Sequence, residues 1–320
     1  MTADLLFAGL GLAILLLAGN SLVRGAVNVS LRLGVPALIV SLTIVAFGTS
    51  APELIISIGA VLEGAPGLAL GNVVGSNTAN ILMVLGIPAL MTGMHTRATE
   101  TRKDYALMMA ATTFFILLAF RGKFDWIAGL ALLAALAVIL GKQAMSALAH
   151  RADAAAAAAA NDHEEVEAAD PNMPWWRILL FLGLGLVGLP LGADLLVDSA
   201  VSIAQQIGVS ETVIGLTLVA IGTSLPELAT TVMAAIRRHA EVALGNVIGS
   251  NMFNLLAIIG AASLFGTIPV DPTFLRFDLW VMAGASLMLA PFVFKLADIN
   301  RVWGAVLTAL YVGYVWMILV

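Results

Sequence analysis

Two blocks of this chain are nearly identical and lie a fixed distance apart. Residues 42–54 read LTIVAFGTSAPEL, and residues 216–228 read LTLVAIGTSLPEL. A second pair, ALGNVVGSNTANIL from Ala69 and ALGNVIGSNMFNLL from Ala243, has the same offset, since 227 − 53 = 174 and 246 − 72 = 174. The chain therefore contains an internal duplication. Because the repeated polar residues lie within apolar sequence, the pattern is typical of a transport site formed between two membrane-embedded halves.

Composition sets the environment. Hydrophobic residues make up 61% of the chain and charged residues 11%, and the mean hydropathy is +1.02, whereas soluble domains carry roughly 25% charged residues. These values indicate an all-α, multi-pass integral membrane protein that has the lipid bilayer, and no nucleic acid, as its partner. The chain contains no Cys, which excludes a disulfide framework or a thiolate metal site.

Apolar runs predict about ten transmembrane helices, given that roughly 20 residues cross the hydrocarbon core. We place these spans at residues 3–32, 36–62, 67–91, 103–120, 124–141, 174–205, 211–236, 241–265, 276–295 and 300–319. The first and sixth spans are unusually long, so they should tilt or extend beyond the bilayer.

Basic residues predict the orientation. If the N-terminus lies outside, 12 of the 15 Lys and Arg residues fall at or near the cytoplasmic side, and only Arg121, Lys123 and Arg276 fall outside. Both termini would then lie outside a plasma (inner) membrane. Each half holds an odd number of spans, so the second half must enter the membrane upside down, giving two inverted repeats of five helices. The predicted units are residues 1–141, a cytoplasmic linker at 142–173 too short for a regulatory domain, and residues 174–320.

The first repeated motif, GTSAPE, predicts a broken helix that holds a carboxylate. Pro52 offers no N–H to the carbonyl of Gly48, so the helix should kink there and leave carbonyl groups free. Inside a membrane, freed carbonyls persist only where an ion or water satisfies them. The surrounding candidates are Ala46, Thr49, Ser50 and Glu53 in the first half, and Ala220, Thr223, Ser224 and Glu227 in the second.

The second motif, GNxxGSN, predicts one polar stripe on each following helix. Four-residue spacing places Asn72, Ser76 and Asn80 on one helix face, and Asn246, Ser250 and Asn254 on another. Close helix packing is an equally good interpretation for Gly75, Gly249, Asn77 and Asn251.

Packing is a poor interpretation for the two glutamates. A charged group at the centre of a span costs roughly 2.5–3.5 kcal/mol, and neither motif contains a Lys or Arg to pair with it. The stripes supply only oxygen ligands, which suit hard cations such as Ca²⁺ or Na⁺ and disfavour zinc or copper. We expect transported ions and no cofactor.

At these motifs the chain resembles the sodium/calcium exchangers of the cation/Ca²⁺ antiporter superfamily. The resemblance covers both motif blocks and the inverted layout. It implies an antiporter that exchanges Ca²⁺ for Na⁺ by alternating access, in which the long first and sixth spans slide across the remaining helices. It implies Ca²⁺ bound by Glu53 and Glu227 with the carbonyls of Thr49 and Thr223. It also implies Na⁺ sites that use Ser50, Ser224, Ser76, Ser250, Asn80 and the carbonyls of Ala46 and Ala220.

One position departs from the resemblance. Many such exchangers carry Asp where this chain has Asn254, so the site here has a formal charge of −2, which matches one Ca²⁺. Coupling to H⁺ or K⁺ therefore stays open beside Na⁺, and a Ca²⁺-permeable channel is the non-antiport alternative.

We expect no enzyme, because no span contains the His that a membrane serine hydrolase needs as a base. Asp194 and Asp198 are interpreted as interface anchors, with an ion vestibule as the alternative.

Overall fold

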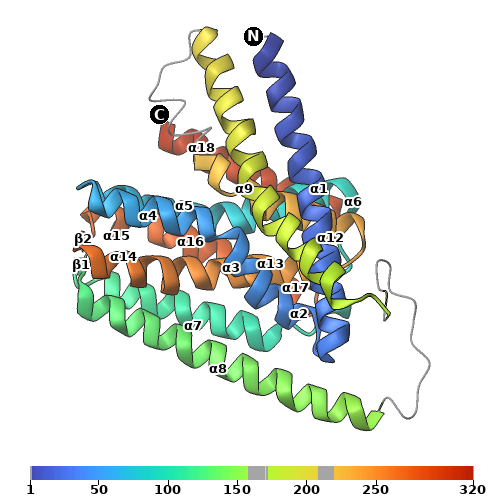
Figure 1. The fold of residues 1–320 in the computed structure, drawn as a ribbon. Coiled ribbons are helices and arrows are strands. Elements are labelled where there is room, and N and C mark those ends of the chain that lie inside the picture. The colour runs from blue at the N-terminus through green and yellow to red at the C-terminus, as the bar shows by residue number, and fades with distance from the viewer. Residues whose placement is uncertain (1, 158–169, 171, 208–219, 320) are drawn as a thin grey trace.

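The computed structural model describes residues 2–157, 170, 172–207 and 220–319, and most of these are helical (Figure 1). The first half contains π-helical turns at Ser41–Val45 and Asn80–Val84 and a 3-10 turn at Thr96–Ala98. Its helices are α1 (Thr2–Leu33), α2 (Ala37–Val40), α3 (Ala46–Thr49), α4 (Ala51–Leu62), α5 (Pro66–Ala79), α6 (Gly86–Thr92), α7 (Arg102–Ala119) and α8 (Trp126–Ala157).

The second half repeats much of this order, with a π-helical turn at Asn254–Ile258. The start of the expected seventh span, residues 211–219, lies outside the described residues. The helices are α9 (Trp175–Gln206), α11 (Ala220–Thr223), α12 (Leu225–Ile236), α13 (Ala240–Phe253), α14 (Ile259–Phe265), α15 (Pro272–Arg276), α16 (Asp278–Leu287), α17 (Ala290–Val293) and α18 (Arg301–Leu319).

Seven helices in the described residues are long and apolar enough to cross a membrane, and the pair Ala37–Thr49 and Ala51–Leu62, bent by 44°, makes an eighth. The prediction of a mostly helical, multi-pass membrane protein is confirmed. The other two expected spans correspond to α7, whose first turn is charged (Arg102–Asp104), and to α11 with the 12-residue α12.

Helices α1 and α9 form a long antiparallel pair that crosses the other helices at a steep angle (Figure 1). Their backbones lie very close to each other, as the space at Gly11 shows. A methyl group added there would lie only 2.7 Å from the backbone nitrogen of Leu196. At the next approach, a methyl group on Gly192 would lie 2.9 Å from the backbone nitrogen of Leu15. Glycine thus permits a contact that any larger residue would push apart.

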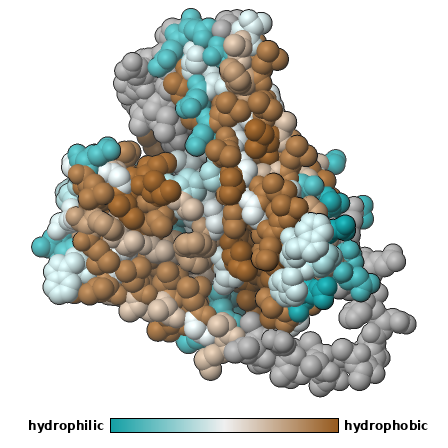
Figure 2. Space-filling model, in the orientation of Figure 1, coloured by the Kyte–Doolittle hydropathy of each residue, from teal (hydrophilic) through white to brown (hydrophobic). Residues whose placement is uncertain are grey.

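Helices α5 and α13 form the buried centre of the molecule. Most residues of the continuous segments Pro66–Thr92 and Ala240–Phe265 are buried. Much of α9, by contrast, presents apolar side chains outward, for example Leu179 at 61% and Val187 at 62% exposure. On the face drawn in Figure 2, apolar residues cover broad areas and most of the hydrophilic residues lie near the edges of the view. This distribution is expected where lipid rather than water surrounds the helices.

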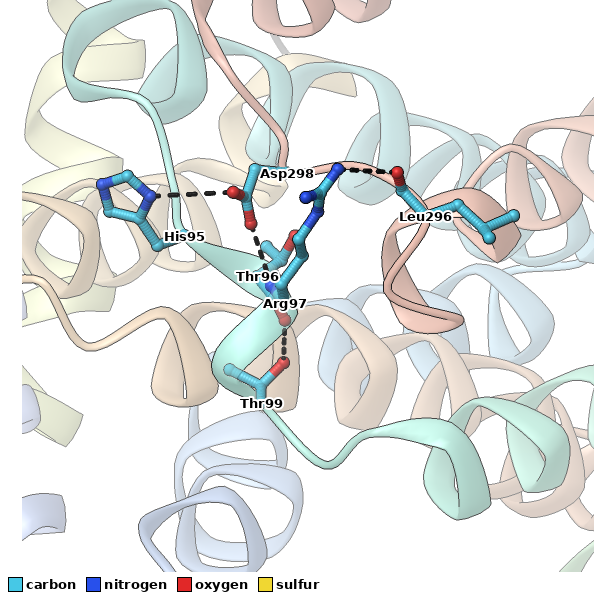
Figure 3. Close-up of polar contacts among 6 residues, drawn as sticks. All are labelled: His95, Thr96, Arg97, Thr99, Leu296 and Asp298. Carbon is cyan, nitrogen blue, oxygen red and sulfur yellow. Dashed lines mark hydrogen bonds and ion pairs between the residues drawn. The ribbon is translucent and has the colours of Figure 1, made fainter.

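Loops from the two halves are joined at both ends of the central helices. At one end β1 (Lys123–Phe124) pairs antiparallel with β2 (Ile268–Pro269). At the other end Asp298 accepts a hydrogen bond of 2.9 Å from the backbone N–H of Arg97 and lies 3.8 Å from His95 (Figure 3).

Two further contacts strengthen the second junction. The guanidinium of Arg97 donates to the carbonyl of Leu296 at 2.7 Å (Figure 3). Lys295 forms a hydrogen-bonded ion pair with Glu100. This hydrogen bond and the positive charge of Lys295 hold the pKa of the Glu100 carboxyl below its usual range. The loops are therefore held to each other across the two halves.

The linker expected at 142–173 begins as helix. Helix α8 continues from the fifth span through residue 142 to Ala157, and the alanines from Ala154 favour helix there because Ala has the highest helix propensity. Residues 158–169 and 171 lie outside the described residues.

Candidate cation site

Each half breaks its helix at the serine before the repeated proline. Ser50 has φ −86° and ψ 6°, and Ser224 has φ −89° and ψ 4°, which lie outside the α-helical region. Helices α4 and α12 begin at the next residue, and each has proline in its first two positions, where the missing N–H is tolerated. The kink predicted from Pro52 is therefore present, and Pro226 has the same arrangement.

Glu53 and Glu227 lie in the first turns of these two helices and are almost completely buried, at 1% and 0% exposure. In the described part of the chain, neither carboxylate forms an ion pair with Lys, Arg or His. Each carboxylate faces the N-terminal end of a helix, where backbone N–H groups favour negative charge. That contribution is small beside the cost of burying an unpaired ion.

Hydroxyl groups from both halves meet at Glu227. Ser50 Oγ donates to Glu227 Oε1 at 3.0 Å, and Ser250 Oγ approaches the same oxygen at 3.5 Å. Because Ser50 lies three residues before Glu53, this hydrogen bond brings the two broken helices together.

Thr49 connects the same centre to helix α13. Its hydroxyl lies 3.3 Å from Asn246 Oδ1 and 3.4 Å from Ser250 Oγ, and also 3.3 Å from the carbonyl of Ala46. Asn246 in turn donates to Thr231 Oγ1 at 3.1 Å. The first half has the equivalent anchor, since Asn72 donates to Ser57 Oγ at 3.2 Å.

Asn80 and Asn254 each lie at the start of a π-helical turn. A π-helical turn adds a residue to the helix and often occurs at functional sites. The amide of Asn80 donates to Asn251 Oδ1 at 3.0 Å, while its own Oδ1 has no hydrogen-bond partner among the described residues. Neither side-chain polar atom of Asn254 has a partner there.

These residues leave a group of buried oxygen atoms unsatisfied within the described chain. Unpartnered buried polar atoms cost about 1–3 kcal/mol each, more when charged, so a group of them calls for a partner. A hard cation suits this donor chemistry. The atoms are both carboxylate oxygens of Glu53, Glu227 Oε2, Ser224 Oγ, Asn80 Oδ1 and Asn254 Oδ1.

A partly open cavity lies beside the two broken helices. Pro52 and Pro226, which immediately precede the two glutamates, form part of its wall together with Thr223. Helix α9 contributes Asp194 and Asp198. The cavity therefore connects an acidic stretch of α9 with the backbone next to both carboxylates.

The equivalent position on the other side is closed. Ala193 lines the cavity, and its repeat counterpart is Gly19, since 193 − 174 = 19. A methyl group on Gly19 would lie only 2.9 Å from the carbonyl oxygen of Ala229 in α12. Helix α1 thus packs tightly where α9 leaves a space.

The remaining site residues predicted from the sequence fall near this centre. Ser76 is buried at 3% exposure on α5, and Ala220 and Thr223 form the ends of the short helix α11. Gly249 packs against α3, since a methyl group there would lie 2.6 Å from Ala46 Cβ. Sequence reasoning missed the anchors Ser57 and Thr231, although a hydroxyl residue at both positions of the 174-residue repeat was a usable signal.

The fold and site define a multi-pass membrane protein with buried, unsatisfied oxygen atoms from both halves at its centre. The family described as sodium/calcium exchanger protein matches residues 4–145 and 177–320, and the chain belongs to this family. The family is one of membrane antiporters that transport sodium and calcium.

Similar proteins match over almost the whole chain. The sodium/calcium exchanger MaX1 of Methanosarcina acetivorans is 33% identical over 344 residues, covering 98% of each chain. The inner membrane protein YrbG of Escherichia coli is 32% identical over 281 residues, covering 88% of this chain and 85% of that protein. A structure of the sodium-calcium exchanger NCX_Mj, soaked with Na⁺ and Sr²⁺, superposes with a TM-score of 0.81 at 30% identity, covering 98% and 97% of the two chains.

Proposed function

We propose that this protein exchanges Ca²⁺ for Na⁺ by alternating access at a site built from Glu53 and Glu227. The observation that carries the proposal is the pair of buried carboxylates, contributed by equivalent breaks in the two halves, with no basic partner in the described chain. One Ca²⁺ neutralises two carboxylates, and so do two monovalent ions, which allows the two substrates to replace each other.

The other polar groups would complete the ion shell. Asn80, Asn254, Ser50, Ser224, Ser76 and Ser250 supply side-chain oxygens, and Ala46, Thr49, Ala220 and Thr223 supply carbonyls. The helix breaks support this assignment, because backbone at membrane depth is irregular only where it borders a cavity or protein groups. The hydrogen bond from Thr49 to the carbonyl of Ala46 leaves that oxygen a second lone pair for an ion.

Two inverted repeats of five helices, residues 1–141 and 174–320, would surround the site. The antiparallel contact between α1 and α9 supports the inversion, since equivalent helices of the two halves run in opposite directions. The positive-inside rule supports an orientation with both termini outside the plasma (inner) membrane. In that orientation the cavity beside Asp194 opens to the outside.

The test is radiolabelled Ca²⁺ uptake into proteoliposomes loaded in turn with Na⁺, with K⁺ or with a pH gradient. We expect uptake that requires internal Na⁺ and stops when the Na⁺ gradient is collapsed. Uptake that follows the pH gradient instead would assign the protein to proton-coupled antiport, and a joint requirement for Na⁺ and K⁺ to potassium-dependent exchange. Uptake without any counter-ion gradient would indicate a channel.

A further inference from the structure

Asn77 and Asn251 cross at the centre of the molecule and bond to each other reciprocally. Asn77 Nδ2 donates to the backbone carbonyl of Asn251 at 3.1 Å, and Asn251 Nδ2 donates to the carbonyl of Asn77 at 3.3 Å. Both side chains are buried, at 1% and 0% exposure. The two residues are repeat equivalents, since 251 − 174 = 77, so this crossing joins the two halves symmetrically.

The side-chain oxygens of this pair do not share the symmetry. Asn251 Oδ1 accepts the amide N–H of the ion-site residue Asn80 at 3.0 Å. The equivalent bond would run from Asn254 Nδ2 to Asn77 Oδ1, and both of these atoms lack a partner among the described residues. Only one of two equivalent hydrogen bonds is therefore formed.

The carboxylates show the same one-sided pattern. Ser50 donates to Glu227, but the equivalent donor Ser224 and the equivalent acceptor Glu53 are both without partners in the described chain. In both hydrogen bonds that are formed, the donor belongs to the first half and the acceptor to the second half.

Access to the site is one-sided as well. The cavity is open where α9 carries Ala193, and the equivalent position is closed where Gly19 of α1 meets α12. An inverted repeat can reach the opposite access state by exchanging the conformations of its halves. The two hydrogen bonds that are not formed here, from Asn254 to Asn77 and from Ser224 to Glu53, are the ones that such an exchange of conformations would form.

We propose that Asn77 and Asn251 are positioning residues that orient the two ion-site asparagines alternately. With the cavity open beside α9, Asn251 holds the amide nitrogen of Asn80 and turns Asn80 Oδ1 toward the ions. In the opposite access state, Asn77 holds the amide nitrogen of Asn254 and Asn80 is released. The inference rests on the proposed exchange function.

Amide chemistry gives the arrangement its effect. An asparagine side chain carries both an acceptor oxygen and a donor NH2, and an unanchored amide can rotate its N–H groups toward the site in place of the oxygen that a cation needs. A hydrogen bond to Nδ2 removes that alternative. When one buried side-chain hydrogen bond is replaced by an equivalent one, the number of polar groups that have a hydrogen-bond partner changes very little. Two states of similar energy can therefore interconvert.

The experiment measures Ca²⁺ KM separately from each side of right-side-out and inside-out membrane vesicles. Asn251→Ala should raise KM about five- to tenfold on the side where the cavity opens, and change it less on the other side, because the hydrogen bond to Asn80 belongs to one state only, whereas the bond to the Asn77 carbonyl is lost in both. Asn77→Ala should show the reverse. If an alanine variant is not recovered from membranes, Asn251→Ser or Asn77→Ser, which keep a small polar group at the crossing, replace it.

A double-mutant cycle separates positioning from packing. The Asn80→Ala/Asn251→Ala variant should be no worse than Asn80→Ala alone on the cavity side, since the two residues act through one bond. Ser57→Ala and Thr231→Val are the matched controls. Their bonds to Asn72 and Asn246 are present in both halves at once, so their effects should not depend on the side.

Equal KM changes on the two sides, or additive effects in the cycle, would overturn the inference while leaving the exchange function intact. Wild-type vesicles that show no Na⁺-driven Ca²⁺ exchange would instead overturn the proposed function, and the inference with it.

Discussion

Glu53 and Glu227 occupy equivalent sequence positions but have different partners. Glu227 accepts hydrogen bonds from Ser50 and Ser250, whereas Glu53 accepts none from the described side chains. At the residue scale, the two carboxylates are therefore not equivalent in this structure.

Neutralising either carboxylate should abolish Ca²⁺ exchange. Glu53→Gln and Glu227→Gln each remove half of the formal site charge that compensates a dehydrated divalent ion. We expect both variants to insert and fold, because an amide replaces the carboxylate at the same volume. Proteoliposome uptake measures the loss. Glu63→Gln, an exposed position at the end of the same helix α4, should retain wild-type exchange, and full exchange by Glu53→Gln would return that residue to a structural role.

Sequence reasoning selected the carboxylates and the hydroxyls as candidate site residues because both halves repeat them. It treated the halves as nearly symmetric, however, and the hydrogen bond from Asn80 to Asn251 has no formed equivalent. No repeat-based argument could find this difference, because two equivalent sequences adopt different conformations only through tertiary packing. The anchors Ser57 and Thr231 were missed for a simpler reason, since they lie outside both motif blocks.

Helix breaks and helix lengths were predictable to different extents. Proline chemistry predicted the kink before Pro52, and the structure bends there by 44°. The π-helical turns at Asn80 and Asn254 were not predicted, because apolar periodicity does not distinguish the hydrogen bonds of a short π-helical turn from those of the surrounding α-helix. Helix α8 extends beyond its predicted end, since apolar runs report membrane span and not helix length.

The close contact of α1 with α12 predicts an element-scale effect. Gly19→Ala would place a methyl group 2.9 Å from the carbonyl oxygen of Ala229, so α1 must move away from α12. Overpacking of this kind costs about 1–3 kcal/mol, which should disfavour the state with the cavity open by at least about fivefold.

This shift can be measured by thiol labelling, because the chain has no cysteine of its own. In a Val197→Cys background, whose thiol would line the cavity, a membrane-impermeant reagent should react more slowly after Gly19→Ala. Gly9→Ala is the matched control on the same helix, since a methyl group there has nothing within 4 Å. Equal labelling rates in the two variants would mean that the α1–α12 contact does not govern access.

At the scale of the whole molecule, the equivalent helices α1 and α9 carry different charges at equivalent positions. Asp194 and Asp198 line the cavity on α9, and their repeat counterparts on α1 are Asn20 and Arg24. Asn20 accepts a hydrogen bond from Arg237 at 2.6 Å. Sequence reasoning favoured interface anchors for the two aspartates, and their place in the cavity wall favours the vestibule alternative instead.

The acidic cavity predicts a charge effect on ion capture from one side of the membrane. The Asp194→Asn/Asp198→Asn variant should raise the Ca²⁺ KM from the cavity side several-fold at low ionic strength, because two negative charges near a cavity mouth concentrate and steer cations. The difference should shrink at about 0.15 M salt and above, where the screening length is about 8 Å or less. The maximal rate and the KM from the opposite side should not change, since neither aspartate belongs to the ion shell.

Asp125→Asn, which removes a charge from a loop remote from the cavity wall, should leave both KM values unaltered. A rise in KM that persists at high salt would instead place Asp194 or Asp198 in direct contact with the bound ion.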